Sequence, residues 1–190
     1  MKSTPPLFEV VSFVPAHAYL AETRPERRLS KEAARKIGDV GGVAYTALYK
    51  GKWAGSAGAI AMWPGRVQVW ALMPETAGFR QTLLFTRTTK DFIDFLFHNE
   101  ICHRVEATVD VGFAPGVKWA RMLGMVPEGT MVMYGPDGHD HFLYARTILL
   151  DAQRDIDNGT RNTTTGGNRN IRCGWCPWYD QRDSIRKKLG

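Results

Sequence analysis

The sequence predicts an α/β (α+β) protein with a mixed, mostly antiparallel central sheet flanked by helices. Three observations support this fold class. Gly and Pro turns at 50–52 and 64–65 divide residues 43–73 into three strand-like runs, as in an antiparallel meander. From about Gly78 to His98, apolar residues recur at helical spacing with no proline. Residues 104–110, RVEATVD, then alternate between polar and apolar, which is typical of a half-buried strand.

A strand and two short helices are expected before the meander. Residues 8–14 are rich in Val and Phe and predict a strand that Pro15 ends. Helical stretches are predicted at 16–23 and 29–38.

A helix followed by a hairpin is predicted after the alternating strand. The helix, from about 115 to 123, is expected to end at Gly124, because glycine is common just past a helix C-terminus. A strand start, a turn at 127–129 and a second strand ending at 135–138 should follow. A final strand is expected at 141–149.

The composition indicates one domain with a tail. A chain of 190 residues with 44% hydrophobic residues can bury one sizeable core. After residue 150 the chain becomes basic and rich in Asn, Thr and Gly, so this part should not fold alone. We therefore divide the chain into a domain, 1–150, and a basic, aromatic-containing interaction arm, 151–190. The arm residues expected to bind a partner are Trp175, Trp178, Tyr179 and Arg182.

Net charge and cysteine content indicate which partners and which cellular compartment to expect. A net charge of +6 favours an anionic partner, such as a phosphate-bearing ligand, nucleic acid or an acidic protein surface. Arginine with tryptophan can stack bases, but no recognised nucleic-acid motif is present, so nucleic acid is not favoured. No apolar stretch approaches the roughly 20 residues of a membrane helix, and Pro5-Pro6 interrupt any signal-peptide core. We therefore expect no membrane partner. Three cysteines make no disulfide framework, so we expect a reducing cytoplasm.

The stretch WARMLGMVPEG carries a family likeness. Its Leu123-Gly124-Met125 and Glu128-Gly129, together with the predicted element order, resemble the GNAT acyltransferase superfamily over about 8–149. The resemblance implies splayed fourth and fifth strands, an acetyl-CoA site at the start of the long helix, and N-acetyl transfer. The tryptophan-rich meander and the lack of a glycine-rich loop more narrowly resemble GNAT-like proteins of tailed bacteriophages, described as virion or morphogenesis proteins.

The implied acetyl-CoA site departs from the family pattern. The family places Gln/Arg, Gly and Gly/Ala where this sequence has Ala77, Arg80 and Thr82. Either the side chains of Arg80 and Thr82 contact phosphate, or bulk closes the cradle and CoA does not bind. The residues expected to bind the cofactor are Leu72, Met73, Gly78, Phe79, Arg80, Gln81, Thr82 and Trp119.

The implied catalytic residues are also altered. The family's acid, a tyrosine that protonates the departing thiolate, corresponds to Ala120, which has no proton to give. Tyr134 or Tyr144 could substitute, although strand tyrosines usually serve packing. A general base is expected at Glu75 or Glu106.

Two of the candidate sites also have ordinary structural interpretations. Glu106 shares a predicted strand face with Arg104 and Thr108, which favours an ordinary solvated or ion-paired carboxylate. His139 and His141 lie on one face of a strand, but two ligands do not close a zinc site, and the CGWC motif at 173–176 is only half of one. No metal is therefore expected.

Two functions remain open on the sequence. The first is a phage-type, acetyl-CoA-dependent N-acetyltransferase with a degenerate cofactor loop, acting in the host cytoplasm. The second is a catalytically inactive GNAT-fold protein, structural or serving virion assembly, that binds other phage virion proteins through residues 151–190. A third, weaker reading is a binding module that inhibits a host factor through the same arm.

Overall fold

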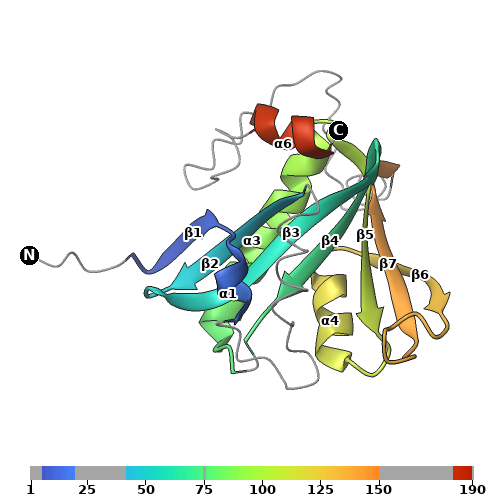
Figure 1. Cartoon of the computed structure of the whole chain (residues 1–190), viewed down its shortest axis with the longest axis horizontal. Coiled ribbons are helices and arrows are strands. Elements are labelled where there is room, and N and C mark those ends of the chain that lie inside the picture. The colour runs from blue at the N-terminus through green and yellow to red at the C-terminus, as the bar shows by residue number, and fades with distance from the viewer. Residues whose placement is uncertain (1–5, 20–41, 75, 150–181, 190) are drawn as a thin grey trace, which may run out of the picture.

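The computed structural model describes residues 6–19, 42–74, 76–149 and 182–189 (Figure 1). The strands in this part of the chain are β1 (Phe8–Ser12), β2 (Val43–Tyr49), β3 (Lys52–Trp63), β4 (Gly65–Leu72), β5 (Cys102–Asp110), β6 (Val126–Met131) and β7 (His141–Thr147). The helices are α1 (Pro15–Tyr19), α3 (Phe79–His98), α4 (Ala114–Met122) and α6 (Arg182–Leu189).

The strands form one sheet in the order β1-β2-β3-β4-β5-β7-β6. Neighbouring strands are antiparallel except for β4 and β5, which are parallel and are joined through α3. The predicted mixed, mostly antiparallel sheet is confirmed. The predicted helix at 29–38 lies outside the described residues, as does the end of the helix expected at 16–23.

The core lies between the sheet and α3. This helix buries one apolar stripe because its large apolar residues recur at helical spacing. Each such side chain contributes about 1.5–3 kcal/mol on full burial. Tyr45 of β2 reaches into the same layer, where its hydroxyl lies 2.7 Å from Thr89 Oγ1. The fully buried side chains of the stripe are Phe85, Ile93 and Leu96, with Phe92 nearly so.

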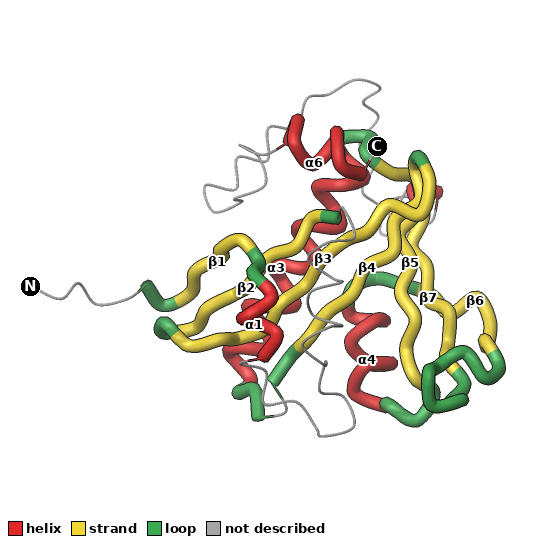
Figure 2. Tube along the Cα trace, viewed as in Figure 1, coloured by secondary structure: helices red, strands yellow, loops and turns green. Residues whose placement is uncertain are grey.

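Strands β4 and β5 pair only over their first residues. The ladder runs from Gly65 opposite Cys102 to Gln68 opposite Glu106, although β4 continues to Leu72 and β5 to Asp110. Beyond that point the two strands diverge, with α4 across the gap (Figure 2). The splay of the fourth and fifth strands is therefore confirmed.

The predicted turn at Pro127-Glu128-Gly129 is wrong, because a single strand, β6, runs through these residues. The register with β7 shifts between Pro127 and Gly129, which marks a bulge. Strand β6 is at the sheet edge, where a proline without an N–H is tolerated. The second strand expected to end at 135–138 is also wrong, since these residues belong to the loop after β6.

The predicted end of α4 at Gly124 is confirmed. Gly124 has a φ of 86°, and its N–H donates to Arg121 O at 3.0 Å. The N–H of Met125 reaches back to Ala120 O at 3.1 Å. This pair of bonds is a Schellman motif, which requires the left-handed conformation that glycine adopts without strain.

The C-terminal helix α6 packs on the domain. Its Ile185 and Leu189 are 1% and 0% exposed, and Arg186 donates to Asn99 O at 3.1 Å. The helix therefore contributes to the core, although the sequence placed it in an interaction arm. Trp175, Trp178 and Tyr179 lie outside the described residues, and Arg182 is the first residue of α6. None of the described helices has the length and apolar character needed to span a membrane.

Candidate functional site

The divergence of β4 and β5 opens a cleft of about 380 Å³. Its sides come from the C-terminal halves of the two strands, and α3 and α4 supply much of the remaining lining. The other lining residues belong to β3, to the loop after β6, to β7 and to the segment after α4. Most lining side chains are apolar. Among them are Val69, Trp70, Ala71, Phe92, Ile93, Ala107, Val109, Phe113, Trp119 and Ala120.

Trp119 joins the two helices that line the cleft. Its indole stacks on Phe85 of α3, with ring centroids 5.9 Å apart and an interplanar angle of 10°. The indole N–H donates to Thr86 Oγ1 at 2.9 Å. The next residue, Ala120, is buried and also lines the cleft, so a methyl group stands where the resemblance places the family's tyrosine.

Among the residues that the structure describes, no side chain caps the N-terminus of α3, which has free space beside it. Its N-cap is Gly78, and no side chain of a described residue caps the helix. The first intrahelical bond runs from Thr82 N–H to Gly78 O, so the amides of residues 79–81 come before the helical ladder. A Cβ built at Gly78 meets no described atom within 4 Å, and Phe79 is 83% exposed. In the described structure, neither residue fills the space before the helix.

The other predicted cofactor residues do not line the cleft. Arg80 is exposed. The amide group of Gln81 donates to Ala54 O at 3.4 Å, which turns it toward β3. Leu72 pairs with Ser56 at the end of β4, and Met73 packs against the core. Of the predicted set, only Trp119 lines the cleft.

Glu106 is held in a charge network away from the cleft lining. It is 4% exposed and accepts hydrogen bonds from Arg66, at 2.5 Å, and from Arg104. Arg104 also pairs with Glu128 of the β6 bulge. Burial alone would raise the pKa of Glu106, but the bonds from Arg66 and Arg104 outweigh it and lower the pKa. The structure thus places the predicted base candidate in an ion-pair network.

The other catalytic candidates are placed as follows. Glu75 lies outside the described residues. Tyr134 is in the loop between β6 and β7, 46% exposed, with its ring centroid 5.3 Å from that of His141. Tyr144 is buried in the core at 1% exposure.

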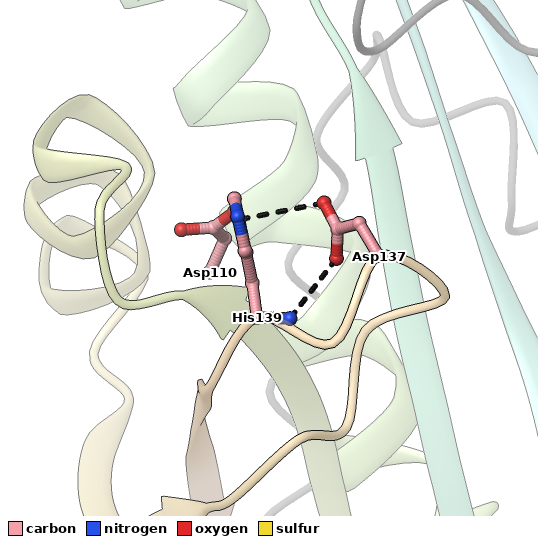
Figure 3. Close-up of side chains that lie close together, drawn as sticks. All are labelled: Asp110, Asp137 and His139. Atoms are coloured by element: carbon pink, nitrogen blue, oxygen red, sulfur yellow. Dashed lines mark hydrogen bonds and ion pairs between the residues drawn. The ribbon is translucent and has the colours of Figure 1, made fainter.

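A group of ionisable side chains lies at the end of the cleft where β5 ends (Figure 3). We call Asp110, Asp137 and His139 the acidic corner. Nδ1 of His139 lies 3.4 Å from an Oδ2 of each aspartate. Their ligand atoms lie within 4.8 Å of one another, and no described residue adds a fourth carboxylate, imidazole or thiol to the group.

The backbone fixes both carboxylates of the acidic corner. Oδ1 of Asp110 accepts the Gly112 N–H at 2.7 Å, and Oδ1 of Asp137 accepts the His139 N–H at 3.2 Å. Asp110 and Asp137 line the cleft, as does His141, whose Nδ1 is buried without a hydrogen-bond partner among the described residues. Sequence reasoning noticed the histidines of GHDHF but missed the aspartates. The one hint in the sequence was that Asp110 ends its predicted strand. Asp110 joins a cluster only because the loop after β6 brings Asp137 and His139 next to it.

The sequence matches no protein-family model and no curated protein, but solved structures share the fold. RimL, a ribosomal alpha-N-protein acetyltransferase in complex with coenzyme A, is 17% identical, over 77% of this chain and 97% of that one, with a TM-score of 0.59. A GNAT-family acetyltransferase from Streptococcus pneumoniae is 16% identical over 74% and 99%, at 0.57. Aminoglycoside acetyltransferase AAC(6')-Ib, with coenzyme A, is 12% identical over 77% and 98%, at 0.59.

These likenesses define the class of fold. The seven-stranded sheet, the splay after Gln68 and Glu106 and the helix that crosses from β4 to β5 are those of a GNAT acetyltransferase fold.

Proposed function

We propose that the protein is an N-acetyltransferase that takes acetyl-CoA and transfers its acetyl group to an amine. The observation that carries this proposal is the cleft between β4 and β5, which opens after Gln68 and Glu106 and is lined on one side by the middle of α3. Structures of the same fold, RimL and the aminoglycoside acetyltransferase, are complexes with coenzyme A.

The residues present suit this co-substrate. A helix N-terminus offers unpaired N–H groups and a favourable dipole to phosphate, and the start of α3 has both, with open space at Gly78. Arg80 is the exposed second residue of the helix, where its guanidinium can add a charged contact. The apolar walls of the cleft, including Trp119, suit the pantetheine arm. When bound, acetyl-CoA supplies an acetyl group activated as a thioester.

Calorimetric titration of the full chain with acetyl-CoA tests the proposal. We expect Arg80→Ala to weaken binding at least about tenfold, because a hydrogen bond to a charged group contributes about 1.5–3 kcal/mol. Arg87→Ala is the matched control, since Arg87 is an exposed residue of the same helix about two turns beyond Arg80. No heat and no thermal shift at millimolar acetyl-CoA would contradict the proposal.

A second candidate is a catalytically inactive GNAT-fold protein of a tailed phage, anchored in or assisting assembly of the virion. The observations that favour it are Ala120 at the expected tyrosine position and the ion-paired state of Glu106. It is the narrower resemblance that supports the phage origin, and with it a location in the host cytoplasm or the virion.

Composition of purified particles tests this alternative. Deleting residues 151–190 is a poor experiment, because it would remove Ile185 and Leu189 from the core. The combined variant W175A, W178A, Y179A changes the predicted anchors instead. The structural role predicts that purified particles contain the wild-type chain at a fixed stoichiometry and that particles made with the variant lack it. Absence of the wild-type chain from purified particles contradicts it.

A further inference from the structure

Helix α1 is attached to the sheet by a chain of side-chain hydrogen bonds. Nδ1 of His17 lies 2.8 Å from Thr46 Oγ1 on β2, and Thr46 Oγ1 lies 2.9 Å from Ser56 Oγ on β3. The indole N–H of Trp53 donates to the same Ser56 oxygen at 3.0 Å. Thr46 and Ser56 are 0% exposed, and the side-chain bonds that the structure describes for them run along this chain. Each buried hydroxyl hydrogen therefore needs its acceptor within the chain.

The donors of this chain all point toward His17. An indole N–H can only donate, so Ser56 accepts from Trp53 and gives its own hydrogen to Thr46. Thr46 in turn gives its hydrogen to Nδ1 of His17. The backbone N–H of Val14, which also can only donate, lies 3.4 Å from the same nitrogen. Nδ1 must therefore be an acceptor, and it is one only in the neutral imidazole.

The segment before α1 reaches a wall of the cleft. The ring of Phe13 packs edge-on against Trp70 of β4, with centroids 5.4 Å apart and an interplanar angle of 74°. Trp70 lines the cleft, and its indole lies on Gly58 of β3, where an added Cβ would be 2.7 Å from the ring. Trp70 follows Gln68, the last residue of β4 that pairs with β5. In the described part of the chain, Trp70 is thus held by β3 and Phe13 and not by β5.

We propose that His17 is a positioning residue for Trp70: in its neutral form it anchors α1 and keeps Phe13 against the indole, and its protonation releases both. Because the imidazole of histidine changes charge near neutral pH, this wall of the cleft responds to pH. The inference does not rest on the proposed acetyl transfer, since it concerns the position of a cleft wall with or without a ligand.

Protonation of Nδ1 would place an N–H against two donors. Thr46 could turn to accept it, but Ser56 would then keep a buried hydrogen without an acceptor, and the Val14 N–H would lose its own. Burial also lowers the pKa of His17 below its ordinary value of 6.5. The anchored form thus binds the proton less readily than a released form would. The anchor is complete above pH 6.5 and is lost as the pH falls through the lowered pKa.

Two charged side chains share this face of strands β1 to β4 in the described structure. Glu9 of β1, on the same face as Thr46, is exposed. Arg66 of β4, on the same face as Trp70, is bound to Glu106. The lowered pKa of His17 has burial as its cause, with no contribution from either charge. The pH response therefore belongs to the hydrogen-bond chain and to burial.

NMR of the full chain across a pH range tests the proposal. The His17 imidazole and the Trp70 indole are followed from about pH 8 to about pH 5, where Glu106 stays ionised because its pKa lies below 4.5. We expect His17 to titrate below pH 6.5 and the Trp70 signals to shift with the same midpoint. The nuclear Overhauser contact between Phe13 and Trp70 should be present at the upper pH and lost at the lower one. A His17 midpoint at or above 6.5, or Trp70 signals that stay unchanged down to about pH 5, would overturn the proposal.

Two substitutions separate the acceptor at position 17 from its charge. Asparagine can accept at Oδ1 and does not titrate, so H17N should keep the contact between Phe13 and Trp70 at both ends of the pH range. H17L, of similar size but without an acceptor, should lose the contact at both ends. If H17L does not fold, T46V replaces it, because loss of the hydroxyl donor should raise the His17 midpoint toward 6.5.

H98N is the matched control, because His98 bonds to Asp94 O at the C-terminal end of α3, and it should titrate like the wild type. If H17N instead keeps the wild-type pH response of Trp70, another group carries that response and the proposal fails. None of these measurements uses acetyl-CoA, so a failure to bind acetyl-CoA contradicts the proposed function and leaves this test unaffected.

Discussion

Trp119 of α4 stacks on Phe85 of α3, and the two rings are within 10° of parallel. This contact holds the helix that follows β5 against the helix that precedes it. Because Phe85 is fully buried and Trp119 lines the cleft, the pair connects the core to the candidate site. The contact therefore joins the packing of the core to one part of the cleft lining.

Replacing Trp119 should affect both stability and binding. Trp119→Ala removes the stacked ring and its bond to Thr86, so we expect the free energy of unfolding to fall by about 3 kcal/mol. Trp119→Phe keeps a stacked ring and loses only the hydrogen bond, at about 1 kcal/mol. Urea denaturation measures both, and acetyl-CoA titration should show weaker binding for Trp119→Ala. Equal stability of the two variants would show that the stack contributes little.

Gly124 is required by its backbone conformation. With φ at 86°, an alanine there should lower the free energy of unfolding by about 1–2 kcal/mol. Gly129→Ala is the matched control, since its Cβ would meet nothing within 4 Å, and we expect a change within about 0.5 kcal/mol. Thermal and urea unfolding of the two variants provide the comparison. An unchanged Gly124→Ala protein would mean that α4 ends differently in solution.

Packing of α6 against the domain should contribute to the free energy of unfolding. Ile185→Ala leaves a cavity under the helix, and we expect a loss of about 3 kcal/mol in the free energy of unfolding. Lys187→Ala, on the exposed side of the same helix, should change little. Chemical denaturation monitored by tryptophan fluorescence measures both. If both variants unfold like the wild type, α6 does not contribute to the core.

Glu106 should make stability depend on pH. Its folded-state pKa is lowered below the ordinary value of 4.5, so the ionised carboxylate stabilises the fold above pH 4.5. That contribution is lost as the pH falls through the folded-state pKa. E106Q should therefore be less stable than the wild type at neutral pH, and the difference should shrink under acid. A difference that stays constant from pH 7 to the acid range would exclude the ion-pair contribution.

The fold was largely predictable because periodicity and turn residues act locally. The strand at 43–49 and the helix at 78–98 match β2 and, to one residue, α3. The turn at 127–129 was not predictable by the same rules. Pro-Glu-Gly favours a turn locally, but pairing with β7 and the Arg104–Glu128 contact hold these residues in an edge strand.

The candidate site was less predictable than the fold. Trp119 was predicted through the family resemblance and does line the cleft, and Glu106 was placed beside Arg104 on one strand face. Asp110 and Asp137 were missed. They are far apart along the chain, and neither residue's sequence neighbours show that a loop will bring it to the other.

By itself the sequence determined the order of strands and helices from β2 to α4 and the break at Gly124, because these depend on neighbouring residues along the chain. The tertiary structure alone decided where β4 and β5 separate, that Ile185 and Leu189 enter the core, and that Asp110 meets His139. Those outcomes depend on contacts between distant segments, and such contacts are set by how whole faces of the sheet and helices pack together.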